Sequence, residues 1–127
     1  MCIYGLGVDL VSLNRIRTIL EKRESQFSKK ICHPHELQSV PQVPQKKIRF
    51  FSSLFAAKEA LAKACGTGFS NGLWFSDIEI LKVKENAPHI KVHGKFRALF
   101  TERSIQRVFL SFSYEKDFCV AVVVLEL

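Results

Sequence analysis

A carboxylate inside an apolar segment is the first feature of this chain that suggests chemistry. Residues Cys2–Val11 alternate as in a β-strand, and Asp9 falls on the same predicted face as Gly5 and Gly7. A charged side chain in such a strand costs free energy unless a partner compensates it. Two interpretations are open: backbone donors or an arginine satisfy Asp9, or Asp9 binds a metal ion in the space that the glycines leave.

A second carboxylate, Glu59, lies in a segment with strong helix propensity. Its neighbours one turn away are Phe55 and Lys63, which places the carboxylate beside an aromatic ring and an ammonium group. Glu59 and Lys63 form either an ordinary surface ion pair, or a functional carboxylate followed by a phosphate-binding lysine. The helix alone does not decide between these interpretations.

The segment Ile48–Gly68 is predicted to form one long helix that stops at Gly66. One broad face is apolar, and small residues mark where another backbone can approach: Ala56, Ala60 and Ala64. Pro41 and Pro44 predict a linker before this helix, whose start is basic: Lys46, Lys47 and Arg49. The glycine-rich loop that follows lets backbone approach a ligand, but it follows a helix instead of opening one, which excludes a P-loop.

A shorter helix, Leu13–Arg23, is predicted directly after the first strand, with Ser12 as its cap. Its apolar residues face inward, and its basic residues form an outward stripe: Arg15, Lys22 and Arg23. This stripe is either a solvated face or a docking surface for an acidic partner.

One or two short helical turns are expected within Ser25–Val40. Pro34 suits the first position of such a helix and is flanked by His33 and His35. We expect no zinc site there, because no cysteine or carboxylate stands at ligand spacing in a recognised pattern.

The C-terminal half is predicted to consist mainly of strands. The expected elements are strands at Asp77–Lys84 and His89–His93, a helix at Lys95–Arg103, and a hairpin of Val108–Tyr114 and Phe118–Leu127. His89 and His93 are expected on the strand surface. The last strand is apolar on both faces, which predicts a central strand or a face at a subunit interface. The chain is therefore predicted to be one α+β domain, residues 1–127, with an antiparallel sheet packed around one long central helix.

Composition limits the class of protein. The 127 residues are 47% hydrophobic and include 11 Phe, which supports a folded core. A net charge of +7 indicates anionic partners, without choosing among nucleic acid, phosphorylated cofactors, acidic proteins and membrane surfaces. The four cysteines form no Cys-x-x-Cys pair, so free thiols and a cytoplasmic location are expected. The apolar N-terminal residues lack a basic leader and contain Asp9, so we expect neither a signal peptide nor a membrane span.

Three segments together resemble the holo-acyl-carrier-protein synthase family. The first signature is similar to Gly5-Leu-Gly-Val-Asp-Leu-Val11, followed by Arg15-Ile16. The second is similar to Phe55-Ala-Ala-Lys-Glu-Ala60, then Lys63-Ala64 and Gly66-Thr-Gly68, and a later strand is similar to Phe75-Ser-Asp-Ile-Glu-Ile80. The likeness covers nearly the whole chain, and the combination is specific although each part alone is not.

This resemblance implies an enzyme that moves 4'-phosphopantetheine from coenzyme A to a serine of apo-acyl carrier protein, in support of fatty acid biosynthesis. It implies a Mg²⁺ ion held by Asp9 and Glu59, with Lys63 as a point charge near the phosphate. The general base would be a metal-bound water or one of the carboxylates. Further coenzyme contacts are expected from Lys58, Gly66, Thr67, Gly68 and Lys47.

The resemblance also implies the partners. The acidic carrier protein is expected to dock on Arg15, Lys22 and Arg23, and Arg15 matches the family's Arg-Ile signature. Members of the family are typically homotrimers with active sites at subunit contacts, and no nucleic-acid or membrane partner is expected.

Two positions depart from the family pattern. Leu54 stands where the family often has Arg, and Tyr114 where it often has His. Both concern the surroundings of the coenzyme phosphates, and the basic cluster Lys46, Lys47 and Arg49 is expected to compensate.

Two alternative functions fit part of the sequence. A small basic nucleic-acid-binding protein would fit the charge, but the aromatic residues lie at core spacing and no basic-aromatic surface motif is present. A family member without activity, acting as an interaction module, is the third interpretation.

Overall fold

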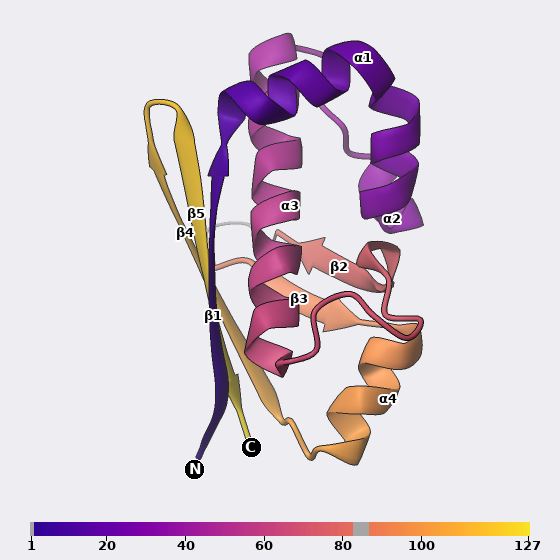
Figure 1. Cartoon of the computed structure of the whole chain (residues 1–127), viewed down its shortest axis with the longest axis vertical. Coiled ribbons are helices and arrows are strands. Elements are labelled where there is room, and N and C mark those ends of the chain that lie inside the picture. Colours follow the sequence, from indigo (N-terminus) through magenta and orange to yellow (C-terminus); the bar gives the residue numbers. More distant parts are fainter. Residues whose placement is uncertain (1, 83–86) are drawn as a thin grey trace.

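The computed structural model describes residues 2–82 and 87–127 and shows an α+β protein (Figure 1). Its elements are β1 (Ile3–Ser12), α1 (Leu13–Ile31), α2 (Pro34–Leu37), α3 (Pro44–Cys65), the 3-10 turn η1 (Phe75–Asp77), β2 (Ile78–Leu81), β3 (His89–Val92), α4 (Gly94–Glu102), β4 (Arg107–Glu115) and β5 (Phe118–Glu126). Residues 83–86, which include parts of the predicted strand and connection, lie outside the described residues. Helix α3 lies between a three-stranded sheet and a second layer that contains the other helices and a two-stranded sheet (Figure 1). The predicted fold class is confirmed.

The main sheet is antiparallel with the order β1–β5–β4, so the apolar C-terminal strand is central, which was one of the two predicted alternatives. On β5, the residues that face α3 are fully buried: Cys119, Ala121, Val123 and Leu125. The register places Asp9 opposite Ala121, so Asp9 shares this inner face. The outer face carries Val120, Val122 and Val124, which continue the apolar surface of Leu6, Val8 and Leu10 on β1.

Strand β1 packs backbone to backbone against α3. A Cβ atom on Gly5 would lie 1.9 Å from the carbonyl oxygen of Ala64, and one on Gly7 would lie 1.9 Å from that of Ala60. These distances exclude any side chain at either glycine without movement of the backbone. The predicted close approach along the small-residue stripe of α3 is confirmed, and the approaching backbone is that of β1.

Two predicted helix boundaries are wrong. Helix α3 begins at Pro44, which occupies its first turn instead of a linker, because proline has the helical φ angle and needs no hydrogen-bond partner there. Helix α1 continues to Ile31, beyond the predicted end at Arg23. Arg23 itself has non-helical angles (φ −155, ψ 51), so α1 is kinked there before it resumes.

Several local predictions are confirmed. Ser12 caps α1 by accepting a hydrogen bond from the backbone of Arg15, and Pro34 opens α2. Gly66 ends α3 in the left-handed conformation, with φ 76. All four cysteines are free thiols, three of them buried: Cys32, Cys65 and Cys119. Within the described part of the chain, no helix combines the length and the apolar character needed to cross a bilayer.

Candidate functional site

The packing of β1 on α3 determines where Asp9 lies. Two residues of a strand advance about 6.6 Å and four residues of a helix about 6 Å. Every second residue of β1 therefore lies beside every fourth residue of α3. Gly5 meets Ala64 and Gly7 meets Ala60, so the next inner residue of β1, Asp9, reaches the turn of α3 that precedes Ala60. This turn carries Glu59. The glycines therefore bring two carboxylates together from residues fifty positions apart.

Lys63 joins the two elements at this point. Its ammonium donates to Oδ1 of Asp9 at 3.0 Å and to the carbonyl oxygen of Val8 at 3.0 Å. The side chain of Asp9 is 14% exposed and that of Lys63 is 53% exposed, so the pair opens to solvent on the lysine side. Lys63 on α3 thus forms an ion pair with Asp9 on β1, so Asp9 has a partner of opposite charge within the chain.

Glu59 lies close enough to Asp9 for their charges to interact. Burial raises the pKa of Glu59, and the negative charge of Asp9 raises it further. Lys63 and Arg15 act in the opposite direction. Two carboxylates placed close together favour a bound cation, and an oxygen-only donor set matches Mg²⁺. The residues present therefore fit the metal that the sequence suggested.

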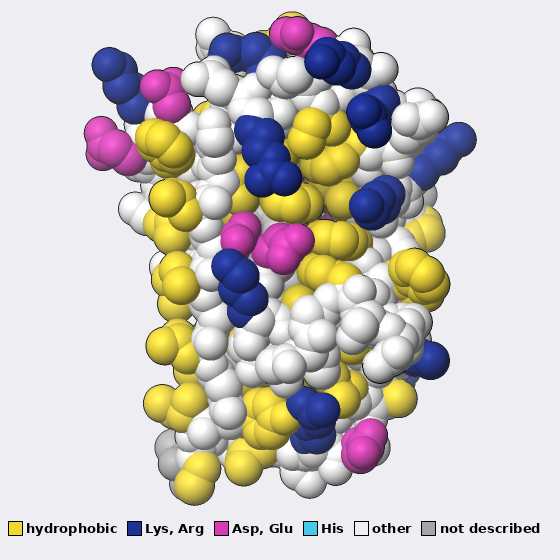
Figure 2. Space-filling model, viewed as in Figure 1, with side chains coloured by type: hydrophobic (Ala, Val, Ile, Leu, Met, Phe, Trp, Pro, Cys, Tyr) yellow, Lys and Arg dark blue, Asp and Glu magenta, His cyan; other side chains and the backbone are white. Residues whose placement is uncertain are grey.

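A hollow next to Glu59 offers space for a ligand. It has a volume of about 520 Å³, and its basic residues come from α1: Arg15, Lys22, Arg23 and Lys30. Three aromatic residues also line it: Phe27, Phe55 and Phe75. Figure 2 shows acidic side chains at the middle of this face, with basic and apolar side chains above them. The predicted basic stripe of α1 therefore borders the carboxylate pair, a relationship that suits an anionic ligand.

Lys58 is not at this site, which corrects its predicted coenzyme contact. Its side chain is fully buried, and its ammonium donates to Glu36 Oε1 at 2.6 Å and to the carbonyl oxygen of Ile31. One position along α3 turns the side chain by about 100°, so Lys58 points into the second layer while Glu59 faces the hollow. Lys58 therefore links α3 to α1 and α2.

The other predicted coenzyme residues lie in two places. Gly66, Thr67 and Gly68 form an exposed turn directly after α3, where the amides of Thr67 and Gly68 donate to Ala62. At the other end of α3, Lys47 pairs with Glu24 at 3.2 Å. Lys47 therefore has an internal partner. A separate hollow is lined by other basic residues: Arg17, Lys46, Arg49 and Lys116.

Leu54 and Tyr114, the two residues that depart from the family pattern, lie in different environments. Leu54 is buried in the core at 5% exposure. The hydroxyl of Tyr114 lies 2.7 Å from that of Ser53, and the guanidinium of Arg49 lies 3.8 Å from the centre of the Tyr114 ring. A cation of the basic cluster therefore lies over the Tyr114 ring, and its expected part in phosphate binding stays a prediction.

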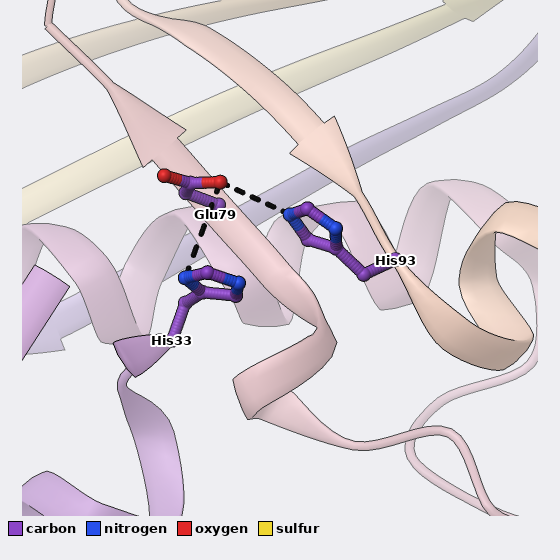
Figure 3. Close-up of side chains that lie close together, drawn as sticks. All are labelled: His33, Glu79 and His93. Carbon is purple, nitrogen blue, oxygen red and sulfur yellow. Dashed lines mark hydrogen bonds and ion pairs between the residues drawn. The ribbon is translucent and has the colours of Figure 1, made fainter. Parts of the chain in front are cut away.

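Sequence spacing missed a second cluster of functional groups. His33 and His35 lie beside the buried carboxylate of Glu79, to which His93 also comes within 3.0 Å (Figure 3). Hydrogen bonds from His93 and His35 outweigh the effect of burial and lower the pKa of Glu79. No pattern in the sequence signals this arrangement, because its members come from three separate segments.

Comparison with known proteins identifies the class that this fold and site define. A family model described as the 4'-phosphopantetheinyl transferase superfamily matches residues 5–123. The chain therefore belongs to this superfamily of enzymes, and the resemblance seen in the sequence is confirmed.

Three similar proteins within this superfamily are named holo-acyl-carrier-protein synthase. A holo-acyl-carrier-protein synthase of Maridesulfovibrio salexigens is 36% identical, with 98% of each chain covered. The crystal structure of such a synthase from Neisseria meningitidis is 38% identical, with a TM-score of 0.91 over 99% of this chain and 100% of that one. A Helicobacter pylori synthase in complex with coenzyme A is 30% identical, with a TM-score of 0.80 over 95% of this chain and 99% of that one.

Proposed function

We propose that this protein transfers 4'-phosphopantetheine from coenzyme A to a serine of apo-acyl carrier protein, with Mg²⁺, in support of fatty acid biosynthesis. The products are holo-acyl carrier protein and adenosine 3',5'-bisphosphate. The observation that carries the proposal is the Asp9–Glu59 pair with Lys63, set beside a basic hollow. The names of the relatives and the coenzyme A complex of one of them support it.

The reaction needs little covalent chemistry from this chain. The serine oxygen of the carrier forms a bond to the β-phosphorus of coenzyme A, and the phosphoanhydride bond to the leaving nucleotide breaks. Because both substrates are anionic, the task of the enzyme is to orient them and to compensate negative charge.

The residues of the site have separate parts in this task. Asp9 and Glu59 would hold Mg²⁺, which supplies charge neutralisation at the pyrophosphate when bound. Lys63 offers a point charge at the same place, and it has partly exposed donors for a phosphate oxygen. Either carboxylate can accept the serine proton.

The basic side chains of α1 give the carrier protein a place to dock. Arg15 lines the hollow with Glu59, and its guanidinium lies 5.9 Å from the centre of the Phe55 ring. A carrier held on Arg15, Lys22 and Arg23 would present its serine beside the carboxylate pair. The coenzyme would extend from the carboxylate pair, with the Gly66–Gly68 turn as a phosphate contact of the same chain. The hollow at Lys46 and Arg49 lies at the other end of α3 and would contact a coenzyme bound across a subunit contact.

We also propose that the enzyme is a cytoplasmic homotrimer with its sites at subunit contacts. The outer face of the main sheet supports an assembly, because Leu6, Val8 and Leu10 are 65%, 52% and 65% exposed. The small-residue stripe of α3 does not contribute to it, since β1 covers that stripe within the chain.

A direct assay tests the proposed activity. Purified protein is incubated with apo-acyl carrier protein, coenzyme A and Mg²⁺, and the carrier is weighed by mass spectrometry. We expect the carrier to gain one phosphopantetheine group, with an equal amount of adenosine 3',5'-bisphosphate released. A carrier of unchanged mass at high enzyme concentration would favour the inactive interaction module.

A further inference from the structure

The cluster around Glu79 lies apart from the carboxylate pair on β1 and α3, and the proposed transfer does not use it. His33 is the N-cap of α2, Glu79 lies in β2, and His93 is the N-cap of α4 directly after β3. Figure 3 shows the two imidazole rings and the carboxylate converging from these three segments. The side chain of Glu79 is 6% exposed, whereas those of His33 and His93 are 13% and 28% exposed. The cluster is thus a buried carboxylate flanked by two imidazoles that are more exposed than it is.

The donor atoms are spaced as ligands of one ion would be. Oε1 of Glu79 lies 3.0 Å from Nε2 of His93 and 4.0 Å from Nδ1 of His33, and the three atoms lie within 4.8 Å of one another. Zinc binds nitrogen and oxygen ligands at about 2.0–2.2 Å, so neighbouring ligand atoms stand about 3–4 Å apart. The two distances from Glu79 are close to this spacing. The rings of His33 and His93 stack with their centres 4.5 Å apart, so one ring would rotate to bring both nitrogens to one centre.

The hydrogen bonds of the cluster show which lone pairs are available. Nδ1 of His33 accepts a hydrogen bond from the backbone N–H of His35 at 3.1 Å, so this nitrogen carries a lone pair and no proton. An ion at the cluster would replace that hydrogen bond. His93 Nε2 shares a hydrogen bond with Glu79, and it becomes a ligand in the other neutral tautomer, with the proton on Nδ1.

Surrounding contacts hold the carboxylate and the backbones that carry the ligands. His35 lies 3.0 Å from Oε2 of Glu79, so it engages the oxygen that does not face His33 and His93. Buried Glu36 accepts hydrogen bonds from the amides of His33 and Ile80, both at 2.8 Å, and thereby ties α2 to β2. Lys58 compensates the charge of Glu36 at 2.6 Å. Outer partners of this kind orient metal ligands in proteins.

From this geometry we infer that His33, Glu79 and His93 bind a divalent transition-metal ion of the Zn²⁺ class. Two imidazole nitrogens and one carboxylate oxygen form a donor set that suits Zn²⁺ and disfavours Mg²⁺, which prefers oxygen ligands. A water molecule would complete a four-coordinate set. The site is separate from the Asp9–Glu59 pair in both its residues and its metal preference.

The chain offers matched variants for a test. His93→Ala removes a ligand, while His89→Ala removes an exposed histidine from the other end of β3 and serves as the control. Tag-free protein is stripped with a chelator, dialysed and titrated with Zn²⁺ by calorimetry and with Co²⁺ by visible absorption. We expect one equivalent bound to wild type, to His89→Ala and to Glu59→Gln, and loss of binding in His93→Ala and Glu79→Gln. His35→Ala should weaken binding by about 10–100-fold, because it removes only an outer partner.

A measurement on the wild-type protein tests the site without relying on variants, which could lose Zn²⁺ binding because they fail to fold. Long-range ¹H–¹⁵N spectra of the histidine rings, recorded with and without one equivalent of Zn²⁺, should show shifted signals of His33 and His93 and an unchanged signal of His89. Absence of saturable Zn²⁺ binding by wild type would overturn the inference. Equal loss of binding in His89→Ala and His93→Ala, or a Zn²⁺-induced shift confined to His89, would also overturn it.

Discussion

The ammonium of Lys63 lies 3.0 Å from Oδ1 of Asp9, so a side chain of α3 partly neutralises the carboxylate that β1 places in the core boundary. Lys63 also donates to the carbonyl oxygen of Val8, the residue before Asp9. The lysine therefore fixes the strand as well as the side chain. Because Glu59 interacts with the same Asp9, the three residues form one electrostatic unit.

The first prediction concerns this unit as a metal site. Glu59→Gln keeps the shape of the side chain but removes its negative charge, so it should reduce the transfer rate by about 10²–10³-fold, as expected for the loss of one electrostatic group. The rate should be measured by carrier mass at limiting and at saturating Mg²⁺. Glu21→Gln, an exposed change on α1, is the control. Full activity of Glu59→Gln at limiting Mg²⁺ would refute the ligand assignment.

The strand face on which Asp9 lies could be predicted from the sequence, because it depends on a local pattern, whereas its closeness to Glu59 was implied only by the family resemblance. Alternation assigned Asp9 to the face of Gly5 and Gly7, and the small residues of the long helix indicated a close backbone approach. The sequence did not indicate that β1 is the backbone that approaches this helix. Once β1 is placed there, the residue spacings of a strand and a helix suffice to bring Asp9 to the turn of Glu59.

The burial of Lys58 and the positions of the clustered histidines could not be predicted from local patterns. Lys58 and Glu59 are neighbours with similar polarity, and which of them is buried depends on Glu36, a residue of the second layer. His33, Glu79 and His93 meet only through tertiary packing, which the separation of the residues in sequence does not reveal. The helix boundaries at Pro44 and Ile31 were missed because proline at a first turn and a kinked helix both look like breaks.

The second prediction concerns the contact between β1 and α3. In Gly7→Ala the new Cβ meets the backbone of Ala60 and Ala64, which cannot turn away as a side chain can. The free energy of unfolding should fall by about 1–3 kcal/mol or more. The wider gap should also separate Asp9 from Lys63 and lower the transfer rate.

Urea unfolding followed by circular dichroism measures this cost. Gly66→Ala is the comparison, because its Cβ would meet nothing within 4 Å and only the positive φ of 76 opposes the change. The cost of Gly66→Ala should be about 1–2 kcal/mol, that of the left-handed conformation alone. Wild-type stability in Gly7→Ala would show that β1 and α3 adjust freely to an added methyl group.

The third prediction concerns docking of the carrier protein. Arg15→Glu reverses a charge at the hollow, so it should raise the concentration of carrier needed for half-maximal rate by about tenfold or more, while coenzyme A binding stays unchanged. Lys29→Glu makes the same charge change at an exposed site of α1 outside the hollow and is the control. If both variants raise the required carrier concentration equally, the basic residues of α1 act only through their overall charge and not as a docking surface.

Salt provides a second measure of the same contact. Wild-type transfer should slow between about 0.05 and 0.5 M salt, because the screening length falls through about 10 Å at 0.1 M. Arg15→Glu should show a smaller response. A rate that does not depend on salt would place the docking surface elsewhere.

The fourth prediction concerns the thiols and pH. Burial raises the pKa of Cys65 to about 11, against the lowering effect of Arg103, whereas Cys2 is exposed. Iodoacetamide at pH 8 should therefore add one group to the native protein, at Cys2, and four groups in denaturant. Mass spectrometry of the intact protein and of its peptides gives the count and the position. Rapid native modification of Cys65 at pH 8 would show that the end of α3 opens.

The raised pKa of Cys65 also sets the sign of a stability effect. Between pH 9.0, the ordinary pKa, and about 11, the unfolded chain loses this proton while the folded chain keeps it. The contribution of Cys65 to stability is therefore complete below pH 9.0 and declines as the pH rises. Cys65→Ala should unfold with a weaker pH dependence in this range.

The fifth prediction concerns assembly through the outer face of the main sheet. On β1 the outward residues Leu6 and Leu10 are each 65% exposed, and they are paired in register with Val124 and Val120. An apolar strip of this kind is stable in water when a second subunit covers it. Leu6→Asp with Leu10→Asp should therefore convert a trimer into a monomer, because carboxylates cannot be buried unpaired at such a contact. Light scattering at micromolar protein measures the mass.

The activity of that double variant distinguishes a site within one chain from a site at a subunit contact. Its carboxylates point away from the face of Asp9, so circular dichroism should remain that of wild type while the transfer rate falls with the loss of assembly. Trp74→Asp is the control, because it removes an exposed apolar side chain, at 64% exposure, outside the main sheet. This control should keep the trimer and its rate. A wild-type chain that is monomeric and fully active, or a monomeric double variant with an undiminished rate, would show that each chain carries a complete site.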